Sequence, residues 1–137
     1  MTFKTTHPAP LQTAVEAGSQ RGRRLDDRIP LRLVLAVAAL WVVSLYVVFS
    51  LAPAPTGDPT ATAIAVGVAF DLSLLGTLAG FVMLRRWGLL ASAAGGVVLL
   101  VGAGLCSLGG HTGGWLVAQY VTGAAILGVS QSAFRRF

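Results

Sequence analysis

The feature that most constrains this chain is the separation of charged from apolar residues. Polar segments separate four long runs that are nearly free of charge, at residues 31–52, 61–84, 89–108 and 115–134. About 20 helical residues cross the hydrocarbon core of a bilayer, and each run is close to that length. Within lipid, backbone N–H and C=O groups must bond inside the segment, which favours α-helices. The pattern predicts an all-α fold, a four-helix transmembrane bundle.

A soluble helical bundle is the alternative, and composition disfavours it. Only 11% of the 137 residues are charged, against about 25% in soluble domains. A soluble bundle also needs a polar stripe along each helix, and residues 33–43 carry none. The net charge of +5 does not point to nucleic acid, because the basic residues flank the apolar runs. We therefore expect the lipid bilayer as the main surrounding and no nucleic-acid partner.

The chain divides into two parts at Pro30. Residues 1–30 form a polar, basic tail with too little apolar material for a core, so we predict that it is mostly disordered. Residues 31–137 form the transmembrane domain. The run at 31–52 also resembles a signal peptide, but both the run and the tail before it are too long for one. We therefore expect an uncleaved helix that begins next to Pro30.

Basic residues alternate strictly between the loops. Of the ten Lys and Arg residues, six lie in the N-terminal segment up to Arg32, two in the turn at 85–88 and two at the C-terminus. The loops around Asp58 and His111 carry none. Lys and Arg of short loops stay in the cytoplasm. This predicts that both termini are cytoplasmic. The Ala-rich, Arg-over-Lys composition is typical of a bacterium, so we expect the inner (cell) membrane.

Asp71 is the one acid inside an apolar run. It lies about 15 Å from the outer end of its helix. A carboxylate at that depth costs about 2.5–3.5 kcal/mol on insertion scales, so we expect it to face protein or water. Intramembrane acids are functional candidates, as a proton or cation site or as a contact to another subunit. The alternative is a structural role, a hydrogen-bonded carboxyl that fixes helix packing.

Other polar side chains fall toward the same outer half as Asp71, and the inner half is nearly all aliphatic. Tyr46 and Gln119 are the best placed to join Asp71 in an intramembrane polar site. One interpretation is a small pocket that opens outward. The other is that these groups hold helices together, at about 0.6 kcal/mol each. The sequence is compatible with both.

Small residues four positions apart indicate close helix packing. Gly76 and Gly80 lie in the second run, and Ala124 and Gly128 in the fourth. Such spacing places small side chains on one helix face, so that backbones can approach closely. The pattern predicts a tight bundle or an oligomer and does not choose between them.

His111, in the loop GGHTGG, is a candidate outer-loop ligand for a metal or a haem. A structural metal site needs about four ligands, and the only other histidine, His7, lies in the tail. The glycines favour a tight turn instead. Cys106, the single cysteine, lies inside a run, where packing is the expected role. We expect no metal and no cofactor.

Three hypotheses for function follow. The favoured one is a non-catalytic accessory or structural subunit of a membrane complex, because the chain has packing motifs and no catalytic constellation. The second is a small oligomeric transporter or channel that uses Asp71 as an intramembrane proton or cation site. The third is a membrane enzyme or haem subunit that uses His111. The expected partners are other membrane subunits or further copies of the chain.

Overall fold

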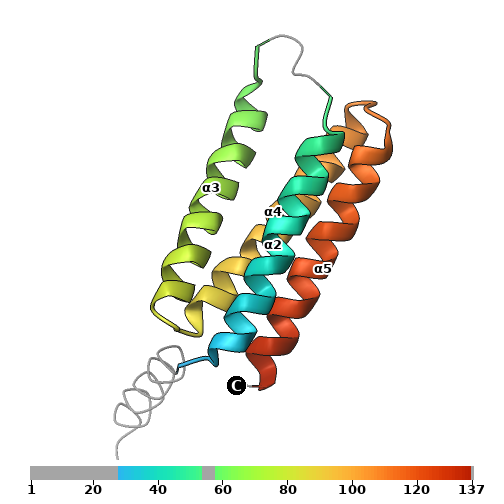
Figure 1. Ribbon diagram of the computed structural model, residues 1–137. Coiled ribbons are helices and arrows are strands. Elements are labelled where there is room, and N and C mark those ends of the chain that lie inside the picture. The colour runs from blue at the N-terminus through green and yellow to red at the C-terminus, as the bar shows by residue number, and fades with distance from the viewer. Residues whose placement is uncertain (1–27, 54–57, 137) are drawn as a thin grey trace, which may run out of the picture.

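The computed structural model describes residues 28–53 and 58–136, and in these ranges the chain is all-helical. The helices run up and down in alternation as a bundle (Figure 1). The predicted disordered tail falls almost wholly outside the described residues. The four predicted helices are confirmed: α2 (Leu31–Leu51), α3 (Ala61–Val82), α4 (Trp87–Leu108) and α5 (Gly114–Arg136).

Three of these helices, α2, α3 and α4, are long and apolar enough to cross a membrane. Within the described ranges α5 is not among them, although it is the longest, at 23 residues. Its apolar content is diluted by glutamines, hydroxyl side chains and two terminal arginines. The chain is thus a multi-pass membrane protein by the length and composition of its helices, and the fourth crossing stays a prediction.

Helix α4 is the centre of the bundle. It packs against α3 on one side and α5 on the other, and α2 packs against α5. The buried core includes Val37, Trp41, Leu89 and Ile126, which come from α2, α4 and α5. Helix α3 has α4 as its main neighbour and meets α2 at the ring pair of Phe70 and Trp41, whose centroids lie 5.8 Å apart. The face of α3 that points away from both helices is left uncovered.

The turn between α3 and α4 lies earlier than the predicted turn at 85–88, because α3 ends at Val82. Leu84 adopts a left-handed φ of 53°. The N–H of Leu84 donates to the carbonyl of Phe81 at 3.0 Å, and that of Arg85 donates to the carbonyl of Gly80 at 2.9 Å. This pair of bonds is the Schellman arrangement that ends a helix. A leucine rarely adopts this φ, and as an apolar residue it gives no sign of a helix end. The end of α3 could therefore not be predicted from the sequence.

Helix α4 ends by the same arrangement, with the glycine that it favours. Gly110 has a φ of 80°, and its N–H donates to the carbonyl of Ser107 at 3.1 Å. The N–H of His111 donates to the carbonyl of Cys106 at 3.1 Å. The interpretation that glycines around His111 serve a tight turn is confirmed at this position.

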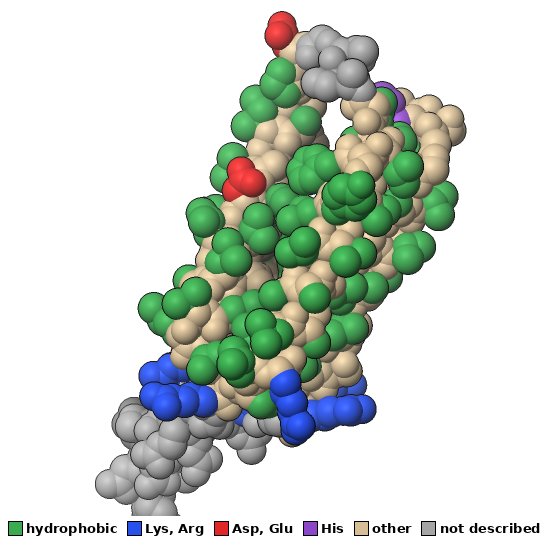
Figure 2. Space-filling view, in the orientation of Figure 1, with side chains coloured by type: hydrophobic (Ala, Val, Ile, Leu, Met, Phe, Trp, Pro, Cys, Tyr) green, Lys and Arg blue, Asp and Glu red, His purple; other side chains and the backbone are tan. Residues whose placement is uncertain are grey.

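The arginines of the described residues gather at one end of the bundle, as the blue side chains in Figure 2 show. We call it the basic end; it holds Arg28, Arg32, Arg85, Arg86, Arg135 and Arg136. The opposite end, here the loop end, holds Asp58 and His111. At the basic end the N–H of Ile29 donates to the carbonyl of Leu84 at 2.9 Å, which ties the start of α2 to the α3–α4 turn.

Candidate functional site

Asp71 lies halfway along α3, and its side chain is exposed. It belongs to a broad apolar face of α3, on which Leu72 and Leu75 are 65% and 62% exposed. Between Ala61 and Ala69 no residue is buried, and only Val66 is half-buried. Figure 2 shows an acidic side chain on the flank of the bundle among hydrophobic side chains. The bundle itself therefore does not cover the acid.

The other two members of the predicted polar site lie on different helices. Tyr46 is on α2 with its side chain 74% exposed. Gln119 is half-buried on α5, and its Nε2 donates to the carbonyl of Leu99 on α4 at 3.3 Å. Among the described residues, no hydrogen bond joins either of them to Asp71. Gln119 thus serves helix packing, and joint action of the three residues stays a prediction.

The glycines of α3 lie where α3 meets α4. A Cβ added to Gly80 would collide with the backbone of Gly88, and one added to Gly76 would lie 3.2 Å from the Cβ of Ala91. Both glycines thus lie where α3 and α4 approach each other closely, which is compatible with the predicted packing role.

The corresponding pair on α5 faces outward instead. Ala124 and Gly128 are both exposed, and a Cβ added to Gly128 would meet nothing within 4 Å. The close approach of α5 to α4 uses Gly123, where an added Cβ would lie 3.1 Å from the carbonyl oxygen of Gly96. Ala124 and Gly128 therefore do not contribute to the α4–α5 interface. A helix that packs against them would be none of α2 to α5.

His111 is exposed in the α4–α5 loop, and Cys106 is half-buried near the end of α4. Across residues 28–53 and 58–136, no group of three or more His, Cys, Asp or Glu side chains lies close enough to hold a metal. A ligand role for His111 stays a prediction.

A chain of buried hydrogen bonds links three helices and was not foreseen from the sequence. Trp41 Nε1 on α2 donates to Ser92 Oγ on α4 at 2.9 Å, and Ser92 Oγ lies 2.8 Å from Ser130 Oγ on α5. All three side chains are buried. Gly95 makes room for the indole, since an added Cβ would lie 2.7 Å from the Trp41 ring. Ser92 and Ser130 lie toward the basic end, so the expectation of a nearly all-aliphatic inner half is wrong.

One sequence signal for this chain existed. Trp41 is a tryptophan in the middle of an aliphatic run, and a buried indole N–H usually needs an acceptor. Which hydroxyl supplies the acceptor depends on how the helices are arranged, and that is not encoded in any single run.

Replacing Ser92 by alanine removes the acceptor of Trp41 and the partner of Ser130. We expect a loss in the free energy of unfolding of about 0.6–1.7 kcal/mol, the range for hydrogen bonds between membrane helices. The matched control is Ser132→Ala on α5, because Ser132 is exposed and its hydroxyl donates to the Val129 carbonyl of its own helix at 2.9 Å. Unfolding in mixed micelles, followed by tryptophan fluorescence, measures both. Equal stability of the two variants would contradict a structural role for Ser92.

Arg86 fastens the start of α4 to the end of α5. Its side chain is buried, Nη2 donates to the carbonyl of Phe134 at 2.9 Å, and Cζ lies 5.2 Å from the centre of the Phe134 ring. A cation over an aromatic face is attracted to it, more so when desolvated. Arg86 therefore helps to hold α4 and α5 together in addition to contributing positive charge to the basic end.

Comparison of the chain with protein-family models, with curated proteins and with solved structures finds no match.

Proposed function

We propose that the chain is a non-catalytic subunit of a bacterial inner-membrane complex and that its partner docks on α3 around Asp71. In this arrangement α5 is the fourth span and both termini are cytoplasmic. The observation that carries the proposal is the exposed carboxyl of Asp71, halfway along an apolar helix. The gathering of arginines at one end supports the orientation, since Lys and Arg concentrate on the cytoplasmic side.

An uncovered carboxyl inside the membrane has a high energetic cost. Asp71 lies about 15 Å from either end of α3, which is the centre of the hydrocarbon core. An acid at that depth costs about 2.5–3.5 kcal/mol and is found facing protein or water. The aliphatic neighbours of Asp71 on the exposed face, such as Leu72 and Leu75, offer it no hydrogen bond. A partner that supplies a donor removes this cost.

The surface of α3 next to Asp71 has room for another helix. Gly67 lies one turn before Asp71 on the same face, and a Cβ added there would meet nothing within 4 Å. Ala63 lies one turn further and is exposed. Small residues at this spacing let the backbone of another helix come close. Because Gly76 and Gly80 already contact α4, Ala63 and Gly67 are available for a helix from outside.

The partner that matches Asp71 carries a hydrogen-bond donor at the same depth in the membrane. The described arginines lie at the basic end, so a second copy in parallel orientation brings no described basic side chain to the depth of Asp71. A different protein, with a transmembrane helix that presents Arg, Lys, Asn or Gln at mid-membrane, matches the carboxyl. The occupant we propose is such a helix, and a pair of Asp71 side chains from two copies is the alternative outcome of the test.

The test is purification of the tagged chain from its native membranes in mild detergent. We expect a different membrane protein to co-purify in fixed ratio and to be lost with Asp71→Leu. The matched control is Tyr46→Leu, an exposed polar residue on α2, which should leave the ratio unchanged. A chain that purifies alone, or with its ratio unaffected by Asp71→Leu, would contradict the proposal.

The exposure of Asp71 also shapes the second hypothesis, a small oligomeric transporter or channel. An acid on the outside of one bundle can serve as a proton or cation site only between copies. That hypothesis requires a homo-oligomer and a flux that Asp71→Asn abolishes, whereas docking of a donor-bearing helix tolerates asparagine because the amide oxygen still accepts a hydrogen bond.

A further inference from the structure

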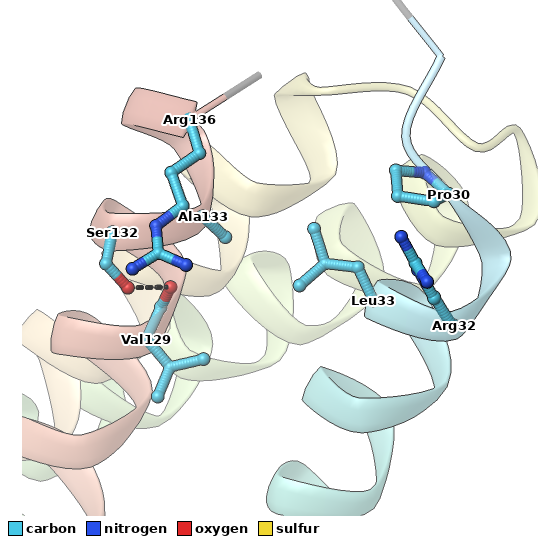
Figure 3. Close-up of a pocket in the computed structure, with 7 residues that line it drawn as sticks. All are labelled: Pro30, Arg32, Leu33, Val129, Ser132, Ala133 and Arg136. Atoms are coloured by element: carbon cyan, nitrogen blue, oxygen red, sulfur yellow. Dashed lines mark hydrogen bonds between the residues drawn. The ribbon is translucent and has the colours of Figure 1, made fainter.

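An open pocket of about 450 Å³ lies at the basic end, between the start of α2 and the end of α5. Arg32, from the first turn of α2, and Arg136, from the last turn of α5, stand on its two sides, with Leu33 between them (Figure 3). Ser132 lies one turn before Arg136, and its hydroxyl donates to the carbonyl of Val129 at 2.9 Å. Both arginines are exposed, so their guanidinium groups can reach a ligand in the pocket.

We propose that this pocket binds the phosphate of an anionic phospholipid headgroup. Guanidinium groups present planar pairs of N–H donors that match phosphate oxygens. No acidic side chain lines the pocket. Within the described ranges the acids are Asp58, at the loop end, and Asp71, halfway along α3. The charge of the two arginines is therefore not neutralised by any residue of the pocket.

The position of the pocket favours a lipid over a soluble phosphate. Arg32 is the second residue of α2, where the apolar run begins, and this is the level of the lipid phosphates. Basic pockets between membrane helices on the cytoplasmic side bind anionic headgroups. The side chains of Leu33 and Val129 add apolar walls that a soluble anion does not need.

A second depression on α5 adjoins the pocket. It measures about 330 Å³ and is lined by Ser132 and Arg136, which it shares with the pocket, and by Gly128, Gln131 and Arg135. Ala124, one turn beyond Gly128, is also exposed. A hydrocarbon chain can lie against the backbone of α5 along these small residues. Binding of a lipid thus assigns a role to the outward-facing pair Ala124 and Gly128, whereas packing within the bundle assigns them none.

The inference is independent of the partner on α3. It requires only that the bundle lies in a membrane, so Asp71→Leu should leave lipid binding unchanged and failure of one proposal does not affect the other. The probe is phosphatidylglycerol against phosphatidylcholine, both offered to the purified full-length chain in detergent. Native mass spectrometry counts the lipids that the protein retains.

We expect the double variant Arg32→Gln/Arg136→Gln to lose about thirtyfold in affinity for phosphatidylglycerol, with phosphatidylcholine unaffected. The matched control is Arg28→Gln/Arg85→Gln, which removes the same charge from residues of the basic end that line neither the pocket nor the α5 depression. Its loss should be far smaller. The variant Arg32→Lys/Arg136→Lys keeps the charge without the planar fork and should fall between, which keeps the test decisive if the glutamine variant does not fold.

Two results would overturn the inference. Equal losses in the two glutamine variants would mean that only the overall charge of the basic end attracts the lipid. Binding of soluble glycerol 3-phosphate as tightly as phosphatidylglycerol would mean that the pocket is a site for a free phosphate and that the α5 depression plays no part.

Discussion

Substitution of Gly80 by alanine separates α3 from α4 and lowers the free energy of unfolding by about 1–3 kcal/mol, the cost of overpacking a tight contact. The added methyl group meets the backbone of Gly88, which cannot turn aside as a flexible side chain does. Because α4 is the main neighbour of α3, a shift at this point loosens the attachment of the whole helix. Unfolding by sodium dodecyl sulfate in mixed micelles, followed by circular dichroism, measures the change.

The control for this variant is Gly67→Ala in the same helix. A Cβ at Gly67 meets nothing within 4 Å, and alanine favours helix over glycine, so we expect no loss in the isolated chain. Equal destabilisation by the two substitutions would show that the α3–α4 contact is not the close one described. A loss with Gly67→Ala only in native membranes would instead point to a partner on that face.

Replacement of Asp71 by leucine has opposite effects on the isolated chain and on the complex. In a translocon assay on α3, we expect insertion to improve by about 3 kcal/mol, more than a hundredfold, because leucine favours the membrane centre and aspartate opposes it. In native membranes the same change removes the hydrogen-bond acceptor that holds the partner. Better insertion of α3 together with weaker binding of the partner is the result expected if Asp71 serves association with that partner.

Thr62→Leu is the control for insertion. Thr62 is exposed near the start of α3, where polar groups reach the interface, so its replacement should change insertion little. If Asp71→Leu improves insertion no more than Thr62→Leu, then Asp71 does not lie at the membrane centre and the energy argument for a partner fails.

The sequence was sufficient to predict where helices lie, because a run of about 20 uncharged residues is typical of a membrane helix and of little else. Helix α2 begins at Leu31 and α3 at Ala61, as predicted, next to Pro30 and Thr60. The side chain of Thr60 accepts a hydrogen bond from the N–H of Ala63 at 3.2 Å, a local feature. The end of α3 was predicted too far along the chain, because Leu84, at which the chain turns, is itself part of the apolar run.

The sequence was not sufficient to predict which way side chains face. In a soluble helix the polar stripe identifies the exposed side. In α3 the exposed face is mostly apolar and the buried face carries the hydroxyls of Ser73 and Thr77, so polarity does not identify the exposed side. The depth of Asp71 therefore followed from the sequence, but its exposure did not. For the same reason, the sequence could not show that Gly128 on α5 faces away from the bundle. The link from Trp41 through Ser92 to Ser130 joins three separate runs and depends on the tertiary arrangement.

The central claim is that a different protein covers α3 at Asp71, and photo-crosslinking in native membranes tests it most directly. A photoreactive residue at Gly67 probes the face of Asp71, and one at Tyr46 probes the exposed side of α2 as a control. We predict that Gly67 crosslinks to one other membrane protein, that Tyr46 does not, and that Asp71→Leu abolishes the product. Crosslinks from Gly67 to lipid alone, or to a second copy of the chain, would contradict the claim.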